Sequence, residues 1–178
     1  MRRLLGPVSG KRAADIGCGH DAALARALFQ SAQSTLLVDV ALDSRLTTSG
    51  VQCREGYLPQ VLVGVADESL DAIICNNVIE HLDHAEETLG HLFRLTAPGG
   101  VCVINVPSWR GKRFLELAAF RLGMAPADEM NDHKTYYDPK DLWPLLVRAG
   151  FRPSEISVRR HKGGLNTIAS CRKPRSAQ

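Results

Sequence analysis

Short apolar runs alternate with stretches of helical periodicity along most of this 178-residue chain. The apolar runs predict buried β-strands, and the stretches between them, where apolar residues recur every three or four positions, predict α-helices. Regular alternation of strand and helix predicts a mostly parallel sheet with helices on both faces. The strands are expected at about residues 12–16, 35–40, 71–75 and 101–106, with one more beginning near Val51, and the helices at about 22–30, 85–95 and 139–149.

The C-terminal part of the chain departs from this alternation. Two further apolar runs, at about 155–161 and 165–171, meet at Gly163 and Gly164 without room for a crossover helix. Strands joined so tightly pair antiparallel. The expected fold is therefore a seven-stranded, mostly parallel sheet that ends in an antiparallel C-terminal hairpin, within one α/β domain that spans residues 1–178.

Residues 107–137 also interrupt the pattern, between the predicted strand that ends near 106 and the helix that begins near 139. A segment that leaves the carboxyl end of a parallel strand can fold over the edge of the sheet where ligands bind. The first predicted strand begins near residue 12, which leaves little chain before it to cover that edge. We therefore expect residues 107–137 to form a lid that also contacts the acceptor.

The first predicted strand ends in a turn that contains Gly17 and Gly19 and leads into a helix. Glycines allow backbone conformations that a Cβ atom disfavours and let the backbone approach a ligand closely. Asp21 is placed to cap the helix that begins at Ala22. The spacing also fits the dinucleotide-binding fingerprint, so the glycines alone leave the cofactor open.

Acidic residues around this turn favour one type of cofactor. Asp15 lies two residues before Gly17, Asp21 follows the turn, and Asp39 ends the next predicted strand. Three carboxylates around one site would repel the pyrophosphate of a dinucleotide. They suit a cofactor that carries a sulfonium and an ammonium group but no phosphate.

These residues resemble motif I of the class I S-adenosylmethionine-dependent methyltransferases, Asp-x-Gly-x-Gly. The run 70–82 looks like strand 4 of that family, ending in Glu-His-Leu, and the Pro-Gly-Gly at 98–100 resembles the segment before its strand 5. The resemblance covers nearly the whole chain and implies a Rossmann-like fold, S-adenosylmethionine as cofactor and methyl transfer as the reaction. Asp21 stands where the family usually has a glycine, but aspartate tolerates left-handed backbone angles, so we expect the turn to be kept.

The resemblance also implies roles for single residues. Asp39 would accept hydrogen bonds from both ribose hydroxyls, and Val40 would contact the adenine. The acid that the family usually places after strand 3 is missing from its expected place, where Tyr57 stands. The expected cofactor-binding residues are Asp15, Gly17, Cys18, Gly19, Asp39, Val40, Tyr57 and Asn76.

Glu80 and His81 raise the question of a metal site. Some relatives in ubiquinone-biosynthesis O-methylation carry a further acid three positions before the glutamate, and the trio is associated with a divalent ion. This chain has Asn77 at that position, so no metal site is expected, and hydrogen bonds at a helix start are the expected role of Glu80 and His81. A hydroxyl acceptor needs a base, for which His81 and His133 are the candidates.

Composition narrows the class of protein further. The formal net charge of +3 is too small to indicate nucleic-acid binding. Five cysteines without metal-ligand spacing indicate reduced thiols in a cytoplasmic protein. The chain has no signal-peptide pattern and no run of about 20 apolar residues that spans a membrane. Basic residues around an apolar stripe near 112–122 suit a peripheral membrane contact, although a core-facing helix is the simpler interpretation.

The sequence therefore predicts a cytoplasmic S-adenosylmethionine-dependent methyltransferase that acts on a small-molecule or lipid- or glycan-linked acceptor. The C-terminal part resembles methyltransferases associated with cell-surface polysaccharide and glycolipid synthesis. Two alternatives stay open. One is a partner subunit that binds S-adenosylmethionine without catalysis, and the other, which the acidic residues disfavour, is a nicotinamide-binding oxidoreductase. The acceptor, the methylated atom and the oligomeric state are not predicted.

Overall fold

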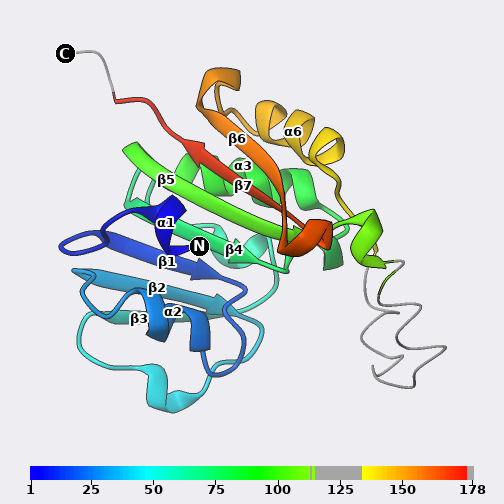
Figure 1. Ribbon diagram of the computed structural model, residues 1–178. Coiled ribbons are helices and arrows are strands. Elements are labelled where there is room, and N and C mark those ends of the chain that lie inside the picture. The colour runs from blue at the N-terminus through cyan, green and yellow to red at the C-terminus, as the bar shows by residue number, and fades with distance from the viewer. Residues whose placement is uncertain (113, 115–133, 176–178) are drawn as a thin grey trace.

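The computed structural model describes residues 1–112, 114 and 134–175 (Figure 1). These residues form a seven-stranded sheet with the strand order β3-β2-β1-β4-β5-β7-β6. Strands β1 to β5 pair parallel, whereas β7 runs antiparallel to both of its neighbours. This arrangement confirms the predicted Rossmann-like sheet. The strands are β1 (Arg12–Ile16), β2 (Ser34–Asp39), β3 (Val51–Glu55), β4 (Leu70–Asn76), β5 (Thr96–Pro107), β6 (Ile156–His161) and β7 (Asn166–Arg172).

Helices cover both faces of the sheet, as the alternation predicts. Figure 1 shows α1 and α2 in front of the sheet and α3 and α6 behind it. Phe29, the residue directly after α2, belongs to the front core, and Leu89 of α3 and Leu142 of α6 belong to the rear one. None of the helices in the described residues is both long and apolar enough to cross a membrane. The helices are α1 (Arg2–Leu5), α2 (Ala23–Leu28), α3 (Ala85–Leu95) and α6 (Pro139–Arg148), with short 3-10 turns η1 (Ser44–Leu46), η2 (Gln60–Leu62), η3 (Ile79–His81), η4 (Pro153–Glu155) and η5 (Lys162–Gly164).

The C-terminal hairpin brings the β6–β7 turn to the edge of the sheet where the parallel strands end. Pro107, at the carboxyl end of β5, pairs with Asn166 at the beginning of β7. The turn η5 therefore lies beside the carboxyl ends of β4 and β5, as Figure 1 also shows. Because ligands bind at this edge in open α/β sheets, the hairpin can contribute side chains to a site.

The structure confirms one predicted helix cap and contradicts another. Asp138 caps α6 as expected, with Pro139 at the first helical position, and its N–H donates to the Asp141 carboxylate over 3.0 Å. The predicted cap at Asp21 is wrong. The residue before α2 is Ala22, which has a left-handed backbone (φ 47°), and Asp21 makes no capping hydrogen bond. The helix therefore begins at Ala23, and Asp21 is not the left-handed residue of the turn.

Most of the predicted lid, residues 113 and 115–133, lies outside the described residues. His133, one of the two candidate bases, lies there as well. Helical residues 109–112 begin the segment after β5, and 134–138 lead back to α6. The role of residues 107–137 as a lid therefore stays a prediction.

Candidate cofactor and acceptor site

The glycine turn after β1 is held between β2 and the segment that follows β4. The N–H groups of Gly17 and Cys18 both donate to the Val38 carbonyl, over 2.7 and 3.1 Å. Gly17 has a left-handed backbone (φ 71°), and a Cβ atom there would lie only 2.2 Å from Cγ2 of Val78. The turn therefore requires glycine at position 17 for its backbone angle and for the close approach of Val78.

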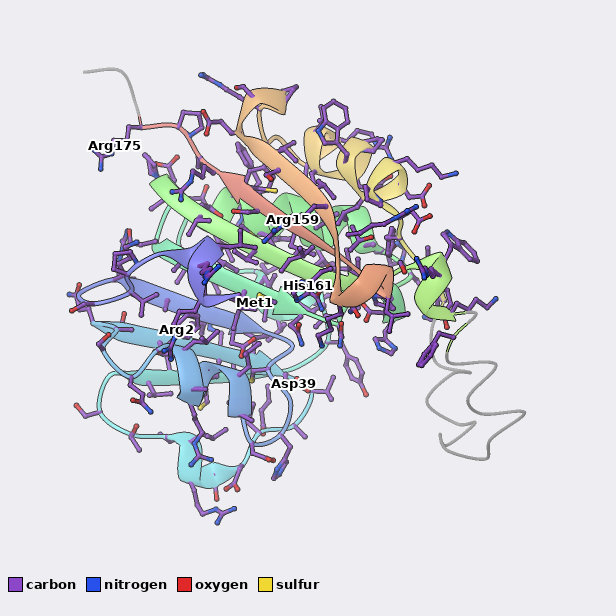
Figure 2. All side chains as sticks on the ribbon, viewed as in Figure 1. Met1, Arg2, Asp39, Arg159, His161 and Arg175 are labelled. Atoms are coloured by element: carbon purple, nitrogen blue, oxygen red, sulfur yellow. The ribbon has the colours of Figure 1, made fainter. Side chains whose placement is uncertain are left out.

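The Asp39 carboxylate fixes the other side of this turn. One of its oxygens accepts the Gly19 N–H over 2.7 Å, and the other accepts the Val40 N–H over 2.8 Å. Both oxygens are thereby oriented at the carboxyl end of β2, beside the glycine backbone. Figure 2 labels Asp39 at this edge of the sheet.

A pocket of about 420 Å³ opens at this edge and brings together most of the predicted cofactor residues. Val40 and Tyr57 border it with exposed side chains, 58% and 78% accessible, and so offer apolar surfaces to a flat ring. Glu55 does not line the pocket, and one oxygen of its carboxylate accepts the Leu42 N–H over 2.7 Å. The predicted residues that line the pocket are Gly17, Gly19, Asp39, Val40, Tyr57 and His81.

Three predicted residues do not line this pocket. Asp15 is buried beneath it, Cys18 points its thiol toward the Gly19 carbonyl over 3.4 Å, and Asn76 accepts a hydrogen bond from Asn105 over 3.1 Å. Asp15 and Asn76 nevertheless lie close in the chain to the lining residues Gly17 and Asn77, in the last two residues of β1 and at the end of β4. Their direct contact with a cofactor stays a prediction.

The structure adds one residue, Asn105, to those expected from the sequence. Asn105 donates its side-chain amide to the side chains of both Asn76 and Asn77, over 3.1 Å each. This bond holds Asn77, which has a left-handed backbone (φ 55°), at the wall of the pocket beside Val78. The signal was a single polar residue, Asn105, near the end of the apolar run 101–106.

Two buried carboxylates near the site make no hydrogen bond of good geometry to any described residue. They are Asp15, at 1% exposure, and Glu80, at 0%. Burial, with a smaller effect from the charge of Asp39, raises the pKa of Asp15 to about 7. Burial likewise raises the pKa of Glu80 to about 7. The backbone N–H groups of Glu80 and Val78, at the start of η3, act in the opposite direction on this pKa, so the expected role of Glu80 at a helix start stays a prediction.

Because the pKa values of these two acids are raised, we expect the protein without cofactor to be more stable at pH 5 than at pH 8. In the unfolded chain they titrate near 3.8 and 4.5, but in the folded chain near 7. Between these values the folded state binds more protons, so the free energy of unfolding falls as the pH rises. At 1.36 kcal/mol per pKa unit, each acid contributes on the order of 3 kcal/mol.

Urea denaturation across this pH range measures the effect. His91 and His161, whose pKa values are lowered mainly by burial, act in the opposite direction, so wild type must be compared with Asp15→Asn and Glu80→Gln. In each variant the free energy of unfolding should fall less steeply with pH than in wild type. Variants that keep the full slope would contradict the assignment of these protons.

His81 lines the cofactor pocket, whereas Tyr136 does not. The role of His81 as a base stays a prediction. Tyr136, from the far end of the predicted lid, is 5% exposed and packs on Trp109 with ring centroids 5.5 Å apart. Among the described residues no group of three or more His, Cys, Asp or Glu side chains is arranged to hold a metal ion.

A sheet of this strand order, with a carboxylate-flanked glycine turn at its carboxyl edge, defines the class of S-adenosylmethionine-dependent methyltransferases. Comparison with known proteins gives the family. A family model described as a methyltransferase domain matches residues 1–156, and the chain belongs to this family.

Individual relatives are distant. The chain is 24% identical over 151 residues to a ubiquinone biosynthesis O-methyltransferase of Rickettsia canadensis, an alignment that covers 80% of this chain and 63% of that protein. The chain thus spans less than two thirds of that relative. A similar fold occurs in an S-adenosylmethionine-dependent methyltransferase from Mesorhizobium loti (TM-score 0.70, 14% identity, 96% of this chain and 94% of that one). Another occurs in a phosphoethanolamine N-methyltransferase of Haemonchus contortus bound to S-adenosylhomocysteine (TM-score 0.72, 12% identity, 97% and 51%).

Proposed function

We propose that this protein transfers the methyl group of S-adenosylmethionine to a hydroxyl oxygen of a small-molecule acceptor. The observation that carries the proposal is the pocket in which Asp39 and the glycine turn meet the apolar surfaces of Val40 and Tyr57. An adenosine fits such a pocket, because Asp39 can accept from ribose hydroxyls while apolar side chains cover the base. The name of the Rickettsia relative supports oxygen as the methylated atom.

The charges around the turn support a cationic cofactor in place of a dinucleotide. Asp15 lies close enough to Asp39 for that charge to raise its pKa, so two acids converge on the loop. A bound ammonium or sulfonium group is attracted by these acids, whereas a pyrophosphate is repelled. Asp15 and Asp39 would hold the cofactor, which supplies an activated methyl group when bound. The chain's own residues then orient the two reactants and exclude water.

Two further parts of the proposal concern where in the cell the protein acts and what its acceptor is linked to. All five cysteines of the chain are unpaired, and Cys75, Cys102 and Cys171 are buried, which supports a reducing, cytoplasmic location. An acceptor linked to a lipid or a glycan, as in cell-surface polysaccharide synthesis, rests on the resemblance of the C-terminal part alone and stays a prediction. So does a peripheral membrane contact.

Isothermal titration calorimetry with S-adenosylhomocysteine and NADH tests the proposed cofactor. S-adenosylhomocysteine should bind, and NADH should neither bind nor compete, because its pyrophosphate would face Asp15 and Asp39. Tighter binding of NADH would contradict the proposal and favour an oxidoreductase. Binding without turnover across a broad panel of hydroxyl acceptors would favour a non-catalytic partner subunit.

A further inference from the structure

A second, smaller pocket lies directly beside the cofactor pocket. Its volume is about 240 Å³, and Asn77 borders both pockets, so a molecule in one faces a molecule in the other. Pro107 and Leu165 give it apolar walls, and its polar side chains come from η3 and from the β6–β7 turn. The lining includes Asn77, Glu80, Pro107, Lys162, Leu165 and Asn166.

Glu80 is the unusual member of this set. Its residue is fully buried, and its carboxylate oxygens make no hydrogen bond of good geometry to any described residue, although the nearby backbone N–H groups of Val78 and Glu80 oppose the effect of burial on its pKa. Its backbone is held firmly, since its carbonyl accepts the N–H groups of Lys134 and Thr135 over 2.9 and 3.2 Å. A buried carboxyl group that makes no hydrogen bond of good geometry is costly to the fold unless a ligand completes its hydrogen bonds.

The opposite side of the pocket is basic. Lys162 borders it from the β6–β7 turn. At the same turn, the side chains of Arg110 and Arg160 both lie within 4 Å of the position that a Cβ atom on Gly164 would occupy. In the described part of the chain Arg160 is paired with Asp138, whose carboxylate lies 4.0 Å from its guanidinium. This side of the pocket therefore attracts a negative charge.

We propose that this pocket holds the reacting end of the acceptor, a compact hydroxylated acid whose negative group binds Lys162 and whose hydroxyl proton passes to Glu80. The inference rests on the proposed function and adds to it the class of substrate and a proton acceptor. The size of the pocket suits a single ring between Pro107 and Leu165. Asn77, held by Asn105, lies where the two pockets meet.

In the proposed transfer step, Glu80 receives the proton that the acceptor hydroxyl loses. The acceptor oxygen forms a bond to the methyl carbon, the bond between that carbon and sulfur breaks, and its electron pair stays on sulfur. The hydroxyl proton moves to the Glu80 carboxylate and later to solvent. Since burial raises the pKa of Glu80 to about 7, the group can take up and release this proton near neutral pH.

Two one-ring probes of matched shape test the proposal on the full chain. Protocatechuate carries a catechol and a carboxylate, and protocatechuyl alcohol replaces the carboxylate with a neutral group. S-adenosylhomocysteine formation gives kcat and KM, and calorimetry on protein loaded with S-adenosylhomocysteine gives probe affinity. Wild type should prefer the acid at least tenfold in kcat/KM, and Lys162→Met should lose this preference through KM. Lys140→Met, an exposed lysine on α6, is the matched control.

Glu80→Gln tests the proton acceptor separately. It should lower kcat at least tenfold and remove the rise of kcat with pH around 7, while its affinity for S-adenosylhomocysteine stays within threefold of wild type. Equal use of both probes, an unchanged preference in Lys162→Met, an unchanged kcat and pH profile in Glu80→Gln, or no binding of either probe each overturns the inference. Failure of S-adenosylhomocysteine itself to bind would instead overturn the proposed function.

Discussion

Asp39→Ala should weaken the binding of S-adenosylhomocysteine at least roughly tenfold, a loss of about 1.5–3 kcal/mol for hydrogen bonds to a charged group. Two effects act together. The variant removes the acceptor proposed for the ribose hydroxyls, and it releases the Gly19 N–H, which Asp39 accepts over 2.7 Å. The turn that supports the cofactor then loses one of its fixed hydrogen bonds.

Calorimetry on Asp39→Ala, Asp39→Asn and Asp21→Ala measures this effect. The asparagine variant keeps a side-chain acceptor but loses the charge, so its affinity should be intermediate. Asp21→Ala is the matched control, because Asp21 is an exposed acid beside the same turn that neither caps α2 nor lines the pocket. Equal losses in the Asp39 and Asp21 variants would contradict the specific role of Asp39.

The strands and most helices could be predicted because their signals are local. The run 71–75 is apolar without interruption after its first residue and lies inside β4, which is flanked by β1 and β5 and buried on both faces. The helix Ala85–Leu95 has the predicted bounds, as its apolar spacing indicates. The Pro-Gly-Gly at 98–100, however, lies inside β5, which begins directly after the helix at Thr96 and so earlier than predicted. The hairpin at Gly163 and Gly164 was also predicted, because so short a connection allows only antiparallel pairing.

The start of α2 could not be predicted from local preferences. Aspartate is favoured both as a cap and in left-handed turns, so both roles were assigned to Asp21. The fold instead buries Ala22 completely and leaves Asp21 exposed. Packing thus places the small Ala22 side chain in the core at the left-handed position, at the cost of an unfavourable backbone angle.

Site residues that lie at the end of a single strand could be predicted from the sequence. Those brought together by the register between two strands could not. Gly17, Gly19 and Asp39 lie at the ends of strands that the sequence locates, and the structure brings them together. Asn105 reaches Asn77 only because β4 and β5 align Asn76 with Asn105, a register that no local pattern specifies. The second pocket also depends on such pairing, because the register of β5 and β7 brings the β6–β7 turn to the end of β5.

Gly17→Ala should lower the free energy of unfolding by about 3–5 kcal/mol, in the range of the most damaging single substitutions. The added methyl group would meet Cγ2 of Val78 at 2.2 Å and would also sit on a left-handed backbone (φ 71°). Gly19→Ala separates the two causes. Its backbone is equally left-handed (φ 74°), but a Cβ atom there meets nothing within 4 Å, so it should cost only about 1–2 kcal/mol.

A double-mutant cycle with Val78→Ala identifies the contact that makes Gly17 necessary. Removing the Val78 methyl groups relieves the collision but leaves the backbone strain. Gly17→Ala and Val78→Ala should therefore show a favourable coupling of about 1–3 kcal/mol, whereas Gly19→Ala and Val78→Ala should be additive within about 0.5 kcal/mol. Urea denaturation of the single and double variants and wild type gives these values. Additive behaviour at Gly17 would mean that Val78 does not press on the turn, and that the glycine is needed for its backbone angle alone.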